Sequence, residues 1–183
     1  TAVTFVGETT ATVNGEVDDD GGEACHYQFG YSPTPGGPYT YTDWSIDAKT
    51  SGQSFSMVIS GLARGTKYYF IAQAKNSAGT GSGYELSFLT KPDAPSSFIA
   101  SATGTSQINL SWIKGEGAQK TKVQRKEGSY PSNKDDGTQV YFGTGGSTPD
   151  TGLTEGTTYY YRAWSYVQGS EQWSDSYAQD WAT

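Results

Sequence analysis

The stretch Gly152-Leu153-Thr154-Glu155-Gly156-Thr157-Thr158-Tyr159-Tyr160-Tyr161 decides the fold of this chain, because it occurs twice. The earlier copy reads Gly61-Leu62-Ala63-Arg64-Gly65-Thr66-Lys67-Tyr68-Tyr69-Phe70. Both copies share the pattern Gly-Leu-x-x-Gly-Thr-x-Tyr-Tyr, and their leucines lie 91 residues apart. In each, a turn with an anchoring leucine leads into a strand that opens on tyrosine. This is the layout of a tyrosine corner, in which the tyrosine hydroxyl bonds back to the upstream backbone. Two corners one small domain apart predict two copies of one β-sandwich.

With these motifs the sequence resembles the fibronectin type III domain. Leu62 and Tyr68, and likewise Leu153 and Tyr159, match the family's junction between strands E and F, and Trp112 matches its buried strand-B tryptophan. These five are the expected fold-determining residues. The matching strand of the first copy, residues 11–17, has no tryptophan. The resemblance covers nearly the whole chain and implies an all-β fold: two antiparallel immunoglobulin-like (fibronectin type III-type) β-sandwiches in tandem. It implies architecture more firmly than function, since one fold serves many roles.

The boundary between the copies is expected at Lys91-Pro92-Asp93-Ala94-Pro95, which gives domains of residues 1–91 and 92–183. Its two prolines restrict φ and predict a semi-rigid joint. The chain opens on Thr1 rather than methionine and stops where the first copy meets its linker. We therefore expect a processed product or fragment of a longer repeat array.

The composition agrees with a turn-rich β-protein: 24 glycines, 14% aromatic residues and 17% charged residues in 183. The net charge is −7, of which residues 1–91 carry −4 and residues 92–183 carry −3. Neither half offers a basic surface, so nucleic acid is not an expected partner. No run of 18 apolar residues occurs, so membrane insertion is not expected, and no signal peptide is predicted within the given residues.

Period-two alternation places the strands and their faces. The expected strands are residues 1–6, 11–17, 24–31, 39–44, 54–60, 68–75 and the stretch ending near 90, then 98–101, 107–112, 120–126, 139–142, the strand from 159 and the stretch ending at 183. Residues 76–83, 129–137 and 168–174 are expected loops. His26 and Gln28 should face solvent, and so should Lys120, Lys122 and Lys126, as a solvated strand that blocks edge pairing.

Catalysis is not expected. The only histidine, His26, adjoins the only cysteine, Cys25. Neighbours on a strand point to opposite faces, so they cannot form a nucleophile–base pair. A zinc site needs about four ligands, which the chain does not supply. No cofactor is predicted. Cys25 is expected to be a small buried hydrophobe, with an intermolecular disulfide as the alternative.

The acidic run at residues 18–23 offers weak calcium candidates in Asp18, Asp20 and Glu23. It lacks the ligand spacing of an EF-hand, and Asp and Gly favour turns, so a solvated turn is the preferred interpretation. The run Asn133-Lys134-Asp135-Asp136-Gly137 is interpreted in the same way.

Exposed aromatic side chains are the candidate contacts for a ligand or partner, because they are large, stiff and, for Tyr and Trp, polar at one end. The candidates are Tyr39, Tyr41, Trp44, Trp164, Tyr166, Trp173 and Tyr177. Their alternative role is to close the sandwich edges or pack on a neighbouring domain. Asn109-Leu110-Ser111 is a glycosylation sequon in which Asn109 faces outward from the middle of a strand.

These observations favour a non-catalytic structural or interaction module, a spacer or adhesive stalk segment of an extracellular or surface-exposed protein. One alternative is a structural protein of a virion or filament, such as a tail, a fibre or a capsid decoration. Another is an accessory glycan-binding module of a secreted polysaccharide-degrading enzyme. The expected partners are neighbouring domains of the same or identical chains and a surface glycan or protein. The expected location is extracellular, on a cell surface or on a virion surface.

Overall fold

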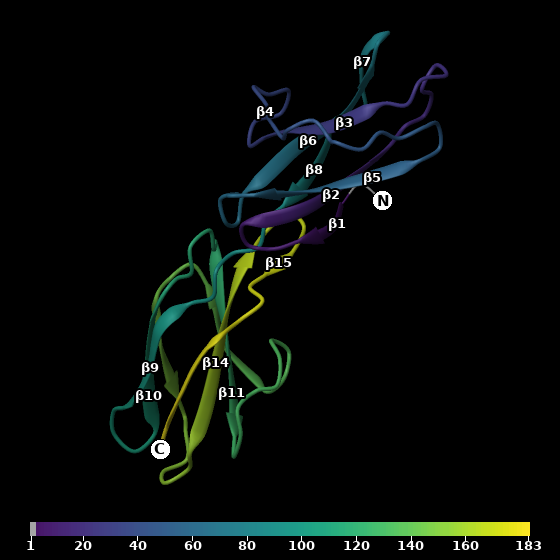
Figure 1. Cartoon of the computed structure of the whole chain (residues 1–183). Coiled ribbons are helices and arrows are strands. Elements are labelled where there is room, and N and C mark those ends of the chain that lie inside the picture. The colour runs from purple at the N-terminus through teal and green to yellow at the C-terminus, as the bar shows by residue number, and fades with distance from the viewer. Residues whose placement is uncertain (1–2) are drawn as a thin grey trace. The chain divides into compact units, whose positions relative to one another are not determined.

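A computed structural model describes residues 3–183, which form strands, turns and loops but no helix. Thr1 and Ala2 of the first expected strand lie outside the described residues. The chain divides into two compact units that meet between Thr90 and Lys91 (Figure 1). Each unit contains two antiparallel sheets, so the predicted all-β class is confirmed for the described residues.

Strands of the first unit form a three-stranded sheet in the order β1-β2-β5, and a second sheet in the order β4-β3-β6-β7, with β8 also paired to β6 (Figure 1). Their bounds are β1 Val3–Val6, β2 Thr10–Glu16, β3 His26–Ser32, β4 Thr40–Tyr41, β5 Ser54–Ser60, β6 Lys67–Asn76, β7 Gly79–Ser82 and β8 Leu86–Leu89.

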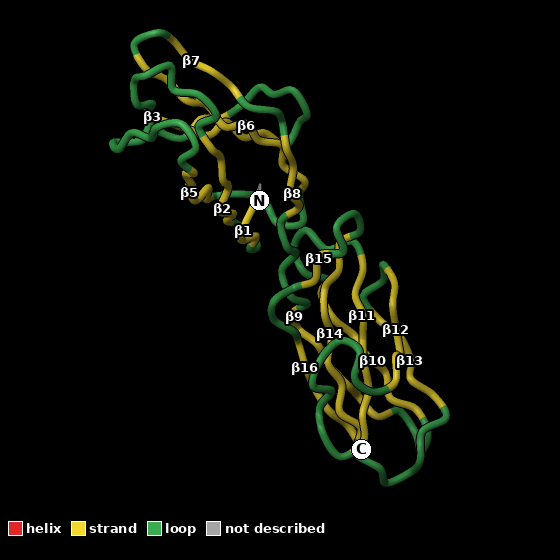
Figure 2. Tube along the Cα trace, turned by 90° about the vertical axis from the view of Figure 1, so that its right-hand side faces the viewer, coloured by secondary structure: helices red, strands yellow, loops and turns green. Residues whose placement is uncertain are grey.

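The second unit repeats this plan, with one sheet in the order β13-β10-β9 and another in the order β12-β11-β14-β15, where β16 also pairs with β14 (Figure 2). The bounds are β9 Ser96–Ala102, β10 Gln107–Ile113, β11 Lys120–Glu127, β12 Thr138–Gly143, β13 Ser147–Thr151, β14 Tyr159–Val167, β15 Gln172–Trp173 and β16 Ala178–Ala182.

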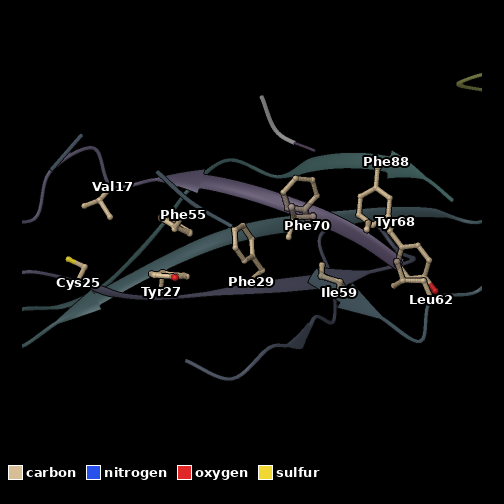
Figure 3. Close-up of a cluster of buried hydrophobic side chains, with 12 residues drawn as sticks. Val17, Cys25, Tyr27, Phe29, Phe55, Ile59, Leu62, Tyr68, Phe70 and Phe88 are labelled. Atoms are coloured by element: carbon tan, nitrogen blue, oxygen red, sulfur yellow. The ribbon is translucent and has the colours of Figure 1, made fainter. Parts of the chain in front are cut away.

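Aromatic rings fill the core of the first unit and lie in a row between its strands (Figure 3). Phe29 packs against Phe55 and Phe70, with ring centroids 5.4 and 6.3 Å apart. Cys25 is buried and free beside them. Phe55, from β5, occupies the region opposite Gly15 of β2, and so compensates for the tryptophan that β2 lacks.

The core of the second unit is built around Trp112 of β10. Its ring lies 6.0 Å from that of Phe98 and 5.1 Å from that of Tyr141.

Farther along the core, Asp150 accepts hydrogen bonds from the Tyr161 hydroxyl at 2.9 Å and from Arg125 Nη1 at 2.8 Å. Burial raises the pKa of Tyr161, and its bond to Asp150 raises it further, so the phenol stays protonated as the donor.

Both tyrosine corners are present. The hydroxyl of Tyr68 accepts a hydrogen bond from the backbone N–H of Ala63 at 3.0 Å, and that of Tyr159 accepts one from Thr154 at 3.1 Å. Both rings are buried. Each bond satisfies a backbone donor of the turn that would otherwise be left unpaired at the end of the core.

Several sequence-based expectations about strands were wrong. Only Thr40–Tyr41 pairs within the expected strand 39–44. The expected loops 76–83 and 168–174 contain β7 and β15, because each folds back on the preceding long strand as a hairpin. β13 was not expected, because its sequence Ser-Thr-Pro-Asp-Thr lacks the apolar alternation of a strand.

Residues on either side of the boundary are hydrogen-bonded within their own units. Thr90 donates through its hydroxyl to the carbonyl of Ala63, and the Asp93 N–H donates to the carbonyl of Glu116. Pro92 is fully buried.

Candidate functional site on the second unit

One face of the larger sheet in the second unit gathers aromatic rings and cations. Residues directly opposite one another on antiparallel strands point to the same side. Lys122 of β11 lies opposite both Phe142 of β12 and Trp164 of β14. Lys120 lies opposite Tyr166, which in turn lies opposite Trp173 of β15. The side chains of four neighbouring strands thus meet on the outer face, away from Val123, which is fully buried in the core.

We call the first group on this face the Trp173 cluster. Its members are Phe142, Tyr166, Trp173, Lys120, Lys122, Lys134 and Asp135. The Trp173 ring lies 4.7 Å from the Tyr166 ring and 6.0 Å from the Phe142 ring. Phe142 is 40% exposed, and Tyr166 and Trp173 are half-buried. The rings therefore support one another and still present an edge to solvent.

Three ammonium groups lie over these rings. The Nζ atom of Lys120 is 5.0 Å from the centroid of Phe142, and those of Lys122 and Lys134 are 5.7 and 5.2 Å from Trp173. Such cation–π contacts contribute about 0.5–1 kcal/mol each at exposed sites. These contacts keep the three ammonium groups beside the aromatic rings.

Asp135 is the one carboxylate of the cluster. It pairs with Lys122 at 2.8 Å and with Lys134 at 2.5 Å. These two lysines, Lys122 foremost, lower the pKa of Asp135 to about 2. Lys120 has no carboxylate partner among the contacts of the described residues, so the cluster carries three positive charges against one negative charge.

The backbone holds the cluster from both sides. Trp173 is fixed by the β14–β15 pairing and by Ser174, whose hydroxyl accepts from the N–H of Ser165 at 3.0 Å. The loop that carries Lys134 is pinned where Gln124 Nε2 donates to the Lys134 carbonyl at 2.7 Å. In the same loop, the Ser132 backbone and hydroxyl and Lys126 lower the pKa of Asp136 to about 2.

A second group, the Arg162 cluster, continues the same face. It contains Tyr130, Tyr160, Arg162, Trp164 and Tyr177. The Arg162 guanidinium lies 4.1 Å from the Tyr177 ring centroid and 5.3 Å from that of Tyr130. Its Nη1 donates to the Pro131 carbonyl at 2.7 Å.

The structure corrects several expectations for this face. Trp164 was expected to be exposed but is only 6% exposed, because the Tyr177 ring packs on it at 5.8 Å. The lysine-bearing strand is not an edge, since β11 lies between β12 and β14. In the first unit, Gln28 is buried rather than solvated, and its amide donates to Gln73 Oε1 at 2.7 Å.

The aromatic candidates of the first unit do not form one comparable cluster. Tyr39 and Tyr41 lie 6.2 Å apart, and the Tyr41 ring covers Gly30. The Tyr39 hydroxyl donates to Glu85, and this bond raises the pKa of Tyr39 to about 12. Trp44 instead lies under Lys75, whose Nζ is 4.2 Å from the ring centroid.

The acidic run at residues 18–23 is a turn whose carboxylates contact its own backbone and neighbours. Asp20 accepts from the N–H of Gly22 at 3.0 Å and the hydroxyl of Ser51 at 3.0 Å. Glu23 accepts from the N–H and hydroxyl of Ser77. Asp18 is exposed. Within residues 3–183, no three His, Cys, Asp or Glu side chains are placed to share a metal ion.

The histidine and the cysteine are used separately. His26 Nδ1 lies 2.8 Å from the carbonyl oxygen of Ser45. Cys25 Sγ lies 3.7 Å from the carbonyl oxygen of Glu23, and burial raises the pKa of its thiol. A thiol held protonated is a poor nucleophile.

Asn109, the asparagine of the glycosylation sequon, lies on β10 between its strand partners Ser101 and Pro149. Its side-chain oxygen accepts a hydrogen bond from Gln107 Nε2 at 2.7 Å.

Four members of this face were predicted from the sequence: Trp164, Tyr166, Trp173 and Tyr177. Seven members were not predicted: Lys120, Lys122, Lys134, Phe142, Arg162, Tyr130 and Tyr160. One signal was available. The lysines of strand 120–126 share a face by alternation, but only the register of β11 against β14 brings that face beside the aromatic one.

A hollow of about 340 Å³ lies elsewhere in the second unit, beside the tyrosine corner, and is lined in part by Ile108, Leu153, Glu155 and Tyr159. Glu155 is the one acidic side chain among its lining residues. Among the described residues, no helix is long and apolar enough to cross a membrane.

Comparison with known proteins identifies the fold. No protein-family model matches the sequence, and no curated protein matches it significantly. Among solved structures, a segment of two fibronectin type III domains from chicken tenascin is similar, with a TM-score of 0.60 and 17% identity. The match covers 99% of this chain and 95% of that one. The predicted tandem fibronectin type III fold is thereby confirmed, and at this identity the likeness shows the fold alone.

Proposed function

We propose that the chain is a non-catalytic interaction module of an extracellular or surface-exposed repeat protein, a segment of an adhesive stalk. In this role its two sandwiches act as spacer and as contact surface. The observation that carries the proposal is the outer face of the second unit, where rings and cations from four strands gather without a nucleophile–base pair. Such composition suits binding, because aromatic and cationic side chains dominate the energetics of many interfaces.

The sequence at the boundary supports the spacer role. Two prolines within Lys91-Pro92-Asp93-Ala94-Pro95 restrict φ in a short segment.

Two measurements on the purified chain test this function. The chain is incubated with ester, peptide and glycoside substrates, and no hydrolysis is expected. Its mass is measured by light scattering over a wide range of concentrations, with electron microscopy of the same samples. A monomer fits the spacer or ligand-binding role, whereas ordered polymers would favour a filament or virion subunit. Turnover that survives repurification would contradict the non-catalytic assignment.

A second candidate function, an accessory glycan-binding module, is favoured by the exposed rings of the Trp173 cluster. Native affinity electrophoresis in gels that contain a polysaccharide tests it directly. Retardation that Trp173→Ala abolishes, and Trp44→Ala leaves unchanged, would place glycan contact on the second unit.

A further inference from the structure

We propose that the Trp173 cluster binds an acidic oligosaccharide, with the carboxylates of uronate residues paired to its lysines and the sugar rings packed on its aromatic side chains. This inference rests on the proposed binding role and specifies the chemical class of the ligand. It follows from three properties of the face: its charge, its aromatic surface and the state of its backbone.

Charge is the first property. The Trp173 cluster holds three ammonium groups and one carboxylate, within a chain whose net charge is −7. The Lys120 ammonium group lies over the Phe142 ring and has no ion-pair partner within residues 3–183. Lys122 and Lys134 share Asp135, so one carboxylate balances two cations. The cluster is therefore a local site for anions on an otherwise acidic molecule, and like charges over the rest of the surface disfavour non-specific binding of polyanions.

The aromatic surface is the second property. Phe142, Tyr166 and Trp173 lie within 6.0 Å of one another and are interleaved with the ammonium groups at 5.0–5.7 Å. A uronate residue has an apolar C–H face and a charged edge a few ångströms apart. The cluster presents the matching pair of surfaces at the same scale. A ligand with charge alone would leave the rings unused, and a neutral sugar would leave the cations unpaired.

The backbone is the third property, and it argues against a peptide. β11 is paired on both sides by β12 and β14, and β14 is paired by β11 on one side and by β15 and β16 on the other. A peptide laid across β11 and β14 would find no free N–H or C=O groups with which to extend the sheet, since unpaired edges remain only at β12, β15 and β16. An oligosaccharide needs none, because it brings its own hydroxyl groups.

The length of the face suits an oligomer rather than a single sugar. From Tyr160 to Tyr166, β14 advances six residues, or roughly 20 Å at the usual rise of a strand. The Arg162 cluster extends the surface over this length, with Arg162 bonded to neutral acceptors and stacked between Tyr130 and Tyr177.

The test measures binding of a galacturonate hexamer to the full chain by isothermal titration calorimetry at low ionic strength. A neutral maltohexaose, a glutamate hexapeptide and an oligothymidylate of six residues serve as comparison ligands. We expect the uronate hexamer to bind at least about tenfold more tightly than each of these. A tenfold rise in ionic strength should weaken its binding, since the exposed charges become screened.

Variants locate the site. Trp173→Ala and Lys120→Gln should each weaken uronate binding by about tenfold, the size expected when a central contact is removed. Lys126→Gln is the matched control on the same strand and face, because Asp136 already neutralises Lys126 at 3.0 Å. Trp44→Ala is the matched control for an aromatic residue under a lysine. Both controls should bind within about twofold of the parent chain.

Each other outcome would overturn the inference. If maltohexaose bound as tightly as the uronate hexamer, the lysine charges would contribute nothing to binding. If the peptide or the oligothymidylate bound more tightly than the uronate hexamer, the ligand of this face would belong to a different chemical class. If the folded parent chain did not bind the uronate hexamer, the Trp173 cluster would not be a uronate site. The same conclusion would follow if both Trp173→Ala and Lys120→Gln bound it as tightly as the parent chain does. Circular dichroism checks the fold of Trp173→Ala, and Lys120→Gln removes no core contact. Hydrolysis of a substrate would instead contradict the proposed function, so the two failures are distinguishable.

Discussion

The ring of Phe55 occupies the space that a side chain at Gly15 would need: a Cβ on Gly15 would lie 2.6 Å from Cζ of Phe55. The two residues are directly opposite on β5 and β2. In the second unit the arrangement is reversed. Trp112 is on β10, and its backbone N–H donates to the carbonyl of Gly146 at 2.8 Å, a glycine in the segment before β13. Each sandwich thus places one large ring and one glycine across the same strand pair.

The close contact between Gly15 and the Phe55 ring predicts that Gly15→Ala destabilises the first unit. The added methyl group must displace the Phe55 ring, and overpacking of a core costs about 1–3 kcal/mol. Differential scanning calorimetry should show a lower Tm for the first unit. Gly81→Ala is the control, because Gly81 lies in β7 with no atom near the position of a Cβ. The double variant Gly15→Trp, Phe55→Gly should lose less stability than the sum of the losses of the two single variants. Additive losses would contradict the idea that one ring can replace the other.

The tyrosine corner predicts that Tyr159→Phe destabilises the second unit by about 0.5–1.5 kcal/mol, because the partly buried hydrogen bond from the N–H of Thr154 loses its acceptor. Urea unfolding followed by tryptophan fluorescence measures this, since four of the five tryptophans lie in the second unit. Tyr160→Phe is the matched control: its ring packs on Tyr130 at 4.9 Å on the outer face. Equal midpoints for the two variants would show that the hydroxyl bond contributes nothing.

The Arg125–Asp150–Tyr161 group predicts a contrast between breaking and replacing a buried polar network. Asp150→Ala leaves the guanidinium and the phenol without their acceptor and should cost about 3 kcal/mol. The corresponding positions of the first unit are Tyr31, Ile59 and Phe70, three apolar or aromatic side chains.

Transfer of those residues tests the same point. The triple variant Arg125→Tyr, Asp150→Ile, Tyr161→Phe should lie within about 1 kcal/mol of the parent chain, because well-packed apolar groups replace buried ion pairs at little cost. The same fluorescence assay gives both free energies of unfolding. If the triple variant were as unstable as Asp150→Ala, the polar group would be essential to this core.

The pKa values of Asp135 and Asp136 predict an acid-sensitive loop in the second unit. Both are lowered to about 2, Asp135 mainly by Lys122 and Asp136 mainly by the Ser132 N–H. A carboxyl group whose folded pKa lies below its unfolded value stabilises the fold above the unfolded pKa, which is near 4. That contribution is lost as pH falls from about 4 to about 2.

Midpoints of urea unfolding at a series of pH values between 2 and 6 measure this dependence. The double variant Asp135→Asn, Asp136→Asn should be less stable than the parent chain at pH 6 and should converge with it near pH 2. Asp175→Asn is the control for a carboxylate outside the loop, paired to Lys91. A constant difference between the double variant and the parent chain across this range would contradict the prediction.

The repeat, the two corners and the inward faces of most strands can be predicted from the amino-acid sequence. Leu62, Tyr68, Leu153 and Tyr159 occur at fixed spacing in one local motif, and alternation assigns Ile108, Leu110 and Trp112 to the core. Such features are local, so a single stretch of chain contains the whole signal. The all-β fold and its tandem arrangement follow from them.

Tertiary structure alone decided the composition of the outer face. Lys120, Phe142, Tyr166 and Trp173 come from four strands, and only the register of the ladders makes them neighbours. The burial of Trp164 likewise depends on Tyr177, thirteen residues away. In the first unit, the ring that replaces the tryptophan absent from β2 is Phe55, which lies on β5. Side-chain contacts across strands depend on pairing between distant segments, and alternation within one strand contains no information about its partner.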